Sequence, residues 1–228
     1  MKSLLYKEFK LSVHPLCYVF IGFSALFFLI PNYPLGVGSI YLLTIIYPFL
    51  FVGVNKGQQS NDLLYTCLLP IRKKDAVKAR VITVIILQLA YLLSASVMFP
   101  VSYLFNYLIN LGIEGPSKVS SPGLGLNSFV LLLAFVVIGL GIADLIYFSI
   151  YYKNGKSIVK STLLTVICFA IYITLFTVVL PLIPGLEILN NLHIGIQFGL
   201  LFVSLLISFG LHYLTYKVAS KKLEKVDF

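Results

Sequence analysis

The sequence predicts an all-α membrane protein that crosses the bilayer six times as a single domain over residues 1–228. Hydrophobic residues make up 59% of the 228 residues and charged residues only 11%, whereas a soluble domain carries about 25% charged residues. The apolar residues gather in six runs, as in a protein that crosses a membrane several times. The basic residues collect in alternate connections between these runs, which is typical of a polytopic membrane protein.

Residues 1–13 predict a short amphipathic helix that lies along the membrane surface. Apolar side chains share one helical face and charged side chains lie off it; the two sets are Leu5, Tyr6, Phe9 and Val13, and Lys7, Glu8 and Lys10.

The six spans are predicted at about residues 16–30, 38–54, 79–109, 129–151, 158–180 and 194–216. The third run is too long for a straight crossing, because thirty helical residues measure about 45 Å and the hydrocarbon core about 30 Å. We expect it to tilt, protrude or bend, with Pro100 as the bend.

The distribution of basic residues predicts which ends face the cytoplasm. Sixteen of the seventeen Lys and Arg residues fall on one side of a six-span arrangement, and only Lys118 falls on the other. The basic side is expected to be cytoplasmic, so both termini and segment 55–80 are predicted inside the cell. This arrangement accounts for the net charge of +9 without nucleic acid as a partner, and it favours contact with anionic lipid.

Segment 55–80, NKGQQSNDLLYTCLLPIRKKDAVKAR, is the long polar interruption between the second and third spans. It predicts a short helix that is capped and apolar, then a proline break, then a basic helix leading into the third span. The residues that carry these features are Asp62, Leu63, Leu64, Tyr65, Leu68, Leu69, Pro70, Arg72, Lys73 and Lys74. Two interpretations stay open: an element that docks onto a partner protein, and a membrane-surface helix with basic anchors.

Asp144 is the only acidic residue within a predicted span. An intramembrane carboxylate is a functional candidate, and the alternative is a carboxyl that is protonated or paired with a hydroxyl or basic group. His14, His193 and His212 are dispersed and are expected to be interface residues rather than metal ligands. No single span carries a His–carboxylate pair, and we expect too few ionisable groups for a proton relay.

The remaining motifs argue against a catalytic centre in this chain. The string NGKS at 154–157 resembles the end of a phosphate-binding loop, but Ile150 stands where the loop needs a glycine. HExxH and GxSxG are absent, and the three cysteines form no C-x-x-C pair. The sequence therefore predicts no metal, no bound cofactor and no ATPase site of its own. Small residues at 195 and 199, and at 139 and 143, predict close helix packing.

The order of an amphipathic N-terminus, six spans and a basic loop after the second span resembles the ABC-2 type permeases of bacterial ABC transporters. Two stretches carry the likeness: DLLYTCLLPIRKKD at 62–75, followed by Val77 and Lys78, and YYKNG at 151–155. The resemblance implies a coupling helix on segment 62–74 that docks onto a separate nucleotide-binding subunit, which binds ATP and Mg. It also implies a second permease chain, as a homodimer or heterodimer, in the bacterial cytoplasmic membrane.

Small stand-alone permeases of this type include exporters of amphipathic peptide toxins such as phenol-soluble modulins, and this sequence is similar to those. The implied function is ATP-driven export of amphipathic or hydrophobic peptides, or of another membrane-borne substrate. Two alternatives stay open: a six-span accessory or scaffold protein, and an intramembrane enzyme. The missing catalytic pairs count against the enzyme.

Overall fold

The computed structural model describes residues 2–13, 15–26, 34–51, 72–112, 126–154, 158–176 and 192–225. Within these ranges the backbone is helical almost throughout and contains no strand. The elements are α1 (Lys2–Lys7), the π-helix η1 (Glu8–Ser12), α2 (Pro15–Leu26), α3 (Pro34–Phe51), α5 (Lys73–Gly112), α6 (Leu126–Asn154), α7 (Ile158–Thr174) and α9 (Ile194–Glu224). The predicted all-α class is confirmed for the part of the chain that the structure describes.

Three helices are long and apolar enough to cross a membrane: Lys73–Ser102 of α5, Phe129–Tyr152 of α6 and Ile194–Glu224 of α9. They correspond to the third, fourth and sixth predicted spans. In the other three predicted spans, α2, α3 and α7 contain shorter apolar helical stretches, namely Pro15–Ser24, Gly38–Tyr47 and Ile158–Thr174. Three long apolar helices within the described ranges therefore support the prediction of a membrane protein.

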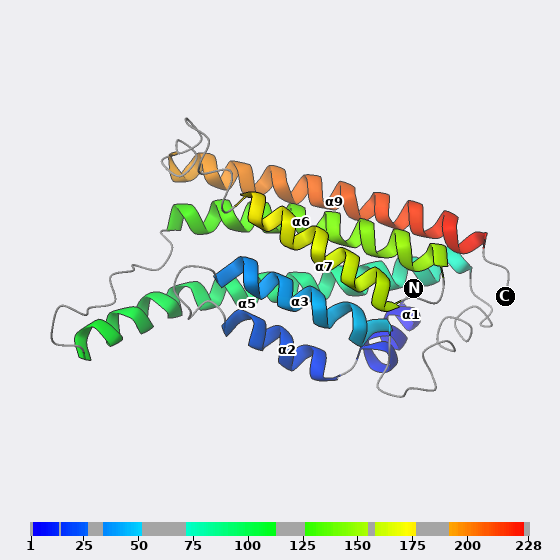
Figure 1. Ribbon diagram of the computed structural model, residues 1–228, viewed down its shortest axis with the longest axis horizontal. Coiled ribbons are helices and arrows are strands. Elements are labelled where there is room, and N and C mark those ends of the chain that lie inside the picture. Colours follow the sequence, from blue (N-terminus) through cyan, green and yellow to red (C-terminus); the bar gives the residue numbers. More distant parts are fainter. Residues whose placement is uncertain are drawn as a thin grey trace.

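The helices form a closed ring in which each contacts the next, in the order α9, α6, α7, α3, α2, α5 and back to α9. Figure 1 shows α6 running along α9, with α7 beside it, and α3 and α2 on the other side of the molecule. α6 is the most buried of the three long helices. Its residues therefore meet side chains from several parts of the chain.

Glycines allow the neighbours of α6 to come close. A Cβ placed on Gly139 would lie 2.7 Å from the ring of Tyr172 on α7, and one on Gly141 would lie 3.1 Å from Leu211 on α9. The predicted close packing at 139 and 143 is confirmed, since Ala143 is also buried. Gly199 has open space around it, so the described helices of this chain do not pack closely against it.

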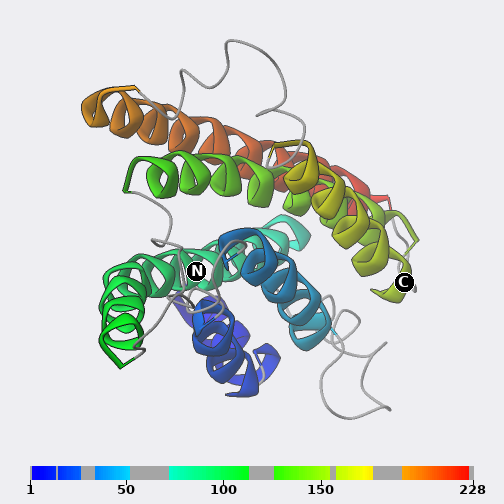
Figure 2. The ribbon, with the colours of Figure 1, turned by 60° about the vertical axis from the view of Figure 1, so that its left-hand side comes forward.

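α5 is a single helix of 40 residues that contains Pro100. It begins with the basic residues after the predicted proline break, and Asp75 lies in its first turn, where a carboxylate is favoured by the helix dipole. The predicted basic helix and third span are thus continuous. Figure 2 shows the later part of α5 turning away from its earlier part, as expected for a helix in which proline removes a backbone hydrogen bond.

The prediction for the N-terminal helix is wrong in two places. Tyr6, expected on the apolar face, is exposed, and Glu8, expected on the polar face, is only 1% exposed. The reason is a partner from another helix: Nε of Arg80 on α5 donates to Oε2 of Glu8 at 3.2 Å. This buried ion pair attaches the N-terminal segment to α5.

Candidate functional site

Asp144 lies on α6 and has no exposed surface. A carboxylate in such an environment is stable only when other groups compensate its charge. Two side chains from other helices donate hydrogen bonds to its Oδ1: the Tyr47 hydroxyl of α3 at 2.5 Å and the Gln88 amide of α5 at 2.9 Å. Of the alternatives for Asp144, pairing with a hydroxyl is therefore observed. The Gln88 amide is a second partner that the sequence did not indicate.

The second carboxyl oxygen faces a histidine. Nδ1 of His212 on α9 lies 3.2 Å from Oδ2 of Asp144, a close electrostatic contact that falls outside hydrogen-bond geometry. On the other side of the ring, Nε2 of His212 lies 3.3 Å from Oγ of Ser208. His212 is 9% exposed, so it packs inside the bundle rather than on its surface.

No single span carries a His–carboxylate pair, but the fold builds one from two helices, α6 and α9. Gly141 precedes Asp144 by three residues and so lies on the same face of α6. Because it has no side chain, Ser208 and Leu211 of α9 approach α6 closely there, and this contact positions His212 opposite Asp144.

Aromatic stacking holds Tyr47 in place. Its ring stacks on the ring of Tyr147, one turn along α6 from Asp144, with centroids 3.9 Å apart and an interplanar angle of 5°. Stacked aromatic pairs contribute about 0.5–1.5 kcal/mol beyond their buried area. The Tyr47 donor is thus fixed by packing as well as by its hydrogen bond to Asp144.

These contacts define the Asp144 cluster, which comprises Asp144, Tyr47, Gln88, His212 and Ser208. It brings together side chains from α3, α5, α6 and α9 inside the bundle. Chemically it is able to hold a negative charge or a proton away from water. Within the described residues, no group of three or more His, Cys, Asp or Glu side chains is placed to hold a metal ion.

The predicted coupling residues fall into two groups. Seven of them lie outside the described residues: Asp62, Leu63, Leu64, Tyr65, Leu68, Leu69 and Pro70. Arg72 precedes α5, and Lys73 and Lys74 form its first residues. Lys74 makes an exposed ion pair with Glu224 near the end of α9, with Nζ 3.0 Å from Oε1.

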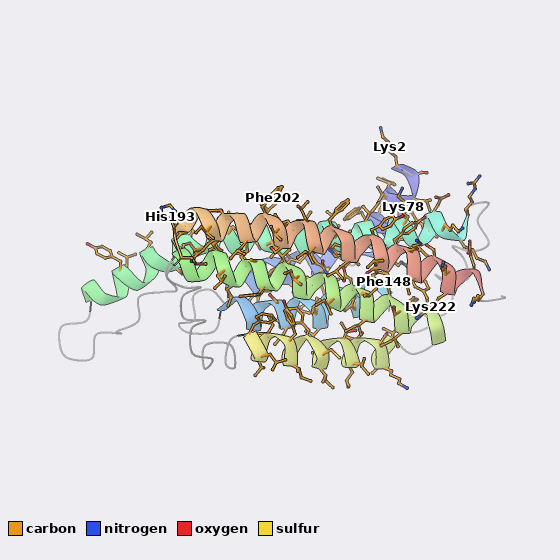
Figure 3. All side chains as sticks on the ribbon, turned by 90° about the horizontal axis from the view of Figure 1, so that it is seen from above. Lys2, Lys78, Phe148, His193, Phe202 and Lys222 are labelled. Atoms are coloured by element: carbon orange, nitrogen blue, oxygen red, sulfur yellow. The ribbon has the colours of Figure 1, made fainter. Side chains whose placement is uncertain are left out.

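Basic side chains gather at one end of the bundle. Figure 3 shows Lys2, Lys78 and Lys222 toward this end and His193 at the other. We call it the basic end; α1, the start of α5 and the end of α9 all lie there. Lys222 also ties two helices together at this end, because its Nζ donates to the carbonyl of Ser149 on α6 at 2.7 Å.

Comparison of the chain with protein-family models, with curated proteins and with solved structures finds no match.

Proposed function

We propose that this chain is the transmembrane subunit of an ATP-driven ABC exporter in a bacterial cytoplasmic membrane. It crosses the bilayer six times with both termini in the cytoplasm. It works with a second permease chain and with a separate subunit that binds ATP and Mg. Its substrates are amphipathic or hydrophobic peptides, or other membrane-borne molecules.

The observation that best supports this proposal is the position of two helix ends, the end of α3 and the start of α5, which flank segment 52–71. α3 ends and α5 begins toward the basic end of the bundle (Figure 1). Both of these helix ends lie toward the end of the bundle that carries Lys2, Lys78 and Lys222 (Figure 3). Because basic ends of membrane proteins face the cytoplasm, the segment is on the side where a soluble ATPase is available.

The continuity of α5 supports a route from the ATPase to the membrane. The helix runs from Lys73 to Gly112 without interruption, so a displacement of its first turn moves residues deep in the bundle. Along its length α5 contacts α2, α9 and the N-terminal segment. A partner bound to segment 62–69 would thus act on several helices through one continuous helix.

The resemblance to peptide-toxin exporters supports the substrate class. Such substrates enter from the membrane or its surface, so the permease needs no receptor domain, and the predicted outer connections are short. An exporter subunit of this kind needs an ATPase partner, whereas an accessory protein or an intramembrane enzyme does not. The presence of an ATPase partner therefore distinguishes the exporter from both alternatives.

The test is copurification of an ATPase with the chain from native membranes. Leu64→Ser combined with Tyr65→Ala removes two apolar side chains of the proposed docking helix. We expect the double variant to lose most of the ATPase, because buried aromatic residues act as interface anchors worth about 2 kcal/mol or more. Tyr65→Ala alone should weaken the complex by about 1–3 kcal/mol.

The matched control is the same pair of residue types at the far end of α5. Tyr107→Ala with Leu108→Ser changes two exposed side chains away from the basic end and should retain the ATPase. Both variants are compared at equal permease levels in the membrane. Undiminished copurification and substrate-stimulated ATPase activity in the Leu64/Tyr65 variant would place the coupling site elsewhere; absence of any ATPase with the wild type would overturn the proposed function.

A further inference from the structure

We infer that the N-terminal segment carries a binding surface for anionic phospholipid headgroups, made by Lys2, Tyr6 and Lys10 on one face of α1 and η1. This surface goes beyond the proposed transport function and does not depend on an ATPase partner.

The three side chains follow one another at intervals of four residues, so they lie along one side of the helical segment. All three are exposed, and Tyr6 keeps 64% of its surface accessible. On the other side of the segment Leu4 and Glu8 are buried, where α1 and η1 contact α5. The segment therefore has one face fixed by packing and one face available to a ligand from outside the chain.

Burial of Glu8 makes the exposed face cationic. Glu8 is the only acidic residue among residues 1–13, and it is withdrawn into the ion pair with Arg80 of α5. In the part of the chain that the structure describes, neither Lys2 nor Lys10 has a carboxylate partner. The exposed face thus presents two positive charges and no negative charge, which is complementary to phosphate groups.

Tyr6 is suited to a position between lipid headgroups and acyl chains. Nζ of Lys10 donates to its hydroxyl at 2.9 Å and lies 5.2 Å from the centre of its ring. Tyrosine is enriched at membrane interfaces, because its ring fits the apolar side and its hydroxyl the polar side. Leu5 and Phe9 are only partly buried and add apolar surface to the segment. Lysines beside aromatic and aliphatic side chains favour a lipid surface over a nucleic acid or an acidic protein.

The direction of α1 places this face at the level of the headgroups. Figure 3 shows α1 projecting from the side of the bundle near the basic end, with Lys2 at its far end. The three helices long enough to cross a membrane run along the bundle (Figure 1), so α1 lies roughly across their direction and along the membrane plane. A basic segment in this position contacts the charged layer of the leaflet at the basic end.

The experiment uses tryptophan as a probe, because the chain contains none. Tyr6→Trp keeps an amphipathic ring at the proposed surface, and the whole chain is held in nanodiscs of phosphatidylcholine with a minor fraction of phosphatidylglycerol. Bromine, which quenches a nearby tryptophan, is carried either by the phosphatidylglycerol or by an equal amount of the phosphatidylcholine. Both samples then have the same surface charge, and only the position of the quencher differs.

Brominated phosphatidylglycerol should quench the tryptophan about threefold more strongly than brominated phosphatidylcholine, because each lysine near an anionic surface favours it by about fivefold. The difference should decrease as salt is added, since salt screens exposed charges. Lys2→Gln combined with Lys10→Gln removes both charges of the surface, so the two lipids should then quench about equally.

The matched control is Lys160→Gln combined with Lys221→Gln, again with Tyr6→Trp. These two lysines are also exposed, but they lie on α7 and α9, so the preference for phosphatidylglycerol at the probe should persist. Equal quenching by the two lipids with all lysines present, or quenching by neither, overturns the lipid surface. A preference that survives the loss of Lys2 and Lys10, or that is lost equally in the control, also overturns it.

Discussion

Nδ1 of His212 lies 3.2 Å from Oδ2 of Asp144, and the two residues come from different helices of the bundle. Both side chains are buried, so their contact is part of the packing of α6 against α9. It is completed by Tyr47 and Gln88, which hydrogen-bond the other carboxyl oxygen. The cluster therefore fixes the relative positions of four helices, and its removal has consequences that can be measured.

Replacing Asp144 by leucine should destabilise the protein by a few kcal/mol. The substitution leaves the Tyr47 hydroxyl and the Gln88 amide without the acceptor that they have in the wild type, and each buried group that loses its partner costs about 1–3 kcal/mol. The free energy of unfolding is measured by denaturant titration in lipid micelles. The proposed export activity should also fall, because the contacts of α6 with α3, α5 and α9 are weakened together.

Ser96→Ala is the control for this prediction. Ser96 is exposed and its hydroxyl donates to the carbonyl of Leu92 in its own helix, so its loss should change stability by about 0.5 kcal/mol or less. If Asp144→Leu unfolds at the same denaturant concentration as Ser96→Ala, the cluster contributes nothing to stability.

Gly141→Val should separate α9 from α6 near the cluster. A Cβ at this position already lies 3.1 Å from Leu211 and 3.2 Å from Oγ of Ser208, and the added methyl groups need space that the packed interface lacks. Overpacking of this kind costs about 1–3 kcal/mol. Hydrogen exchange of the α9 backbone around His212 should become faster.

The contrasting change is Gly199→Ala, which lies on α9 itself. Nothing lies within 4 Å of a Cβ there, and alanine is about 1 kcal/mol more favourable than glycine in a helix interior. We expect this variant to be as stable as the wild type or more stable. Loss of stability in Gly199→Ala would show that this surface is covered, for instance by a second chain.

The helical class was predictable from the sequence because a backbone in lipid must satisfy its hydrogen bonds internally, and the apolar runs mark where this happens. The Asp144 cluster was not predictable, because it depends on which helices become neighbours in the ring. One signal was present: Gln88 and His212 each interrupt an apolar run, and polar residues within spans tend to pair with one another. Asp144 pointed to a site, but not to its partners.

The N-terminal segment shows the same limit. Helical periodicity assigned Glu8 to a polar face, as it does for a helix that meets only water and lipid. Arg80, in the second turn of α5, supplies a buried partner that periodicity does not reveal. Side-chain exposure on a short helix is thus decided by a residue far away in the chain.

Glu8→Ala should detach the N-terminal segment from α5. The pair is buried, with side-chain exposures of 2% for Glu8 and 5% for Arg80, and removing one member of a buried pair costs about 3–5 kcal/mol because a buried ion pair is lost. Proteolysis of residues before Val13 should become faster. Combining Glu8→Ala with Arg80→Met removes both charges of this ion pair and should recover part of the lost stability.

Glu224→Ala provides the comparison, since it breaks the exposed pair with Lys74. Exposed pairs contribute about 0–1 kcal/mol, so unfolding should change little. Equal effects of the two glutamate substitutions would mean that burial of Glu8 has no energetic role.

The last prediction concerns which end of the bundle faces the cytoplasm. α5 begins at Lys73 at the basic end, whereas His193 lies at the opposite end of the molecule (Figure 3). After the natural cysteines are replaced by serine, single cysteines are placed at positions 73, 118 and 193 and treated in intact cells with a membrane-impermeant maleimide. Positions 118 and 193 should react and position 73 should not, because the side with sixteen of the seventeen basic residues is held inside.

All three should react once the cells are opened, which shows that each site is accessible. If only position 73 reacts in intact cells, the topology is the reverse of the one predicted. The proposed docking segment 62–69 would then lie on the side of the membrane that has no ATPase.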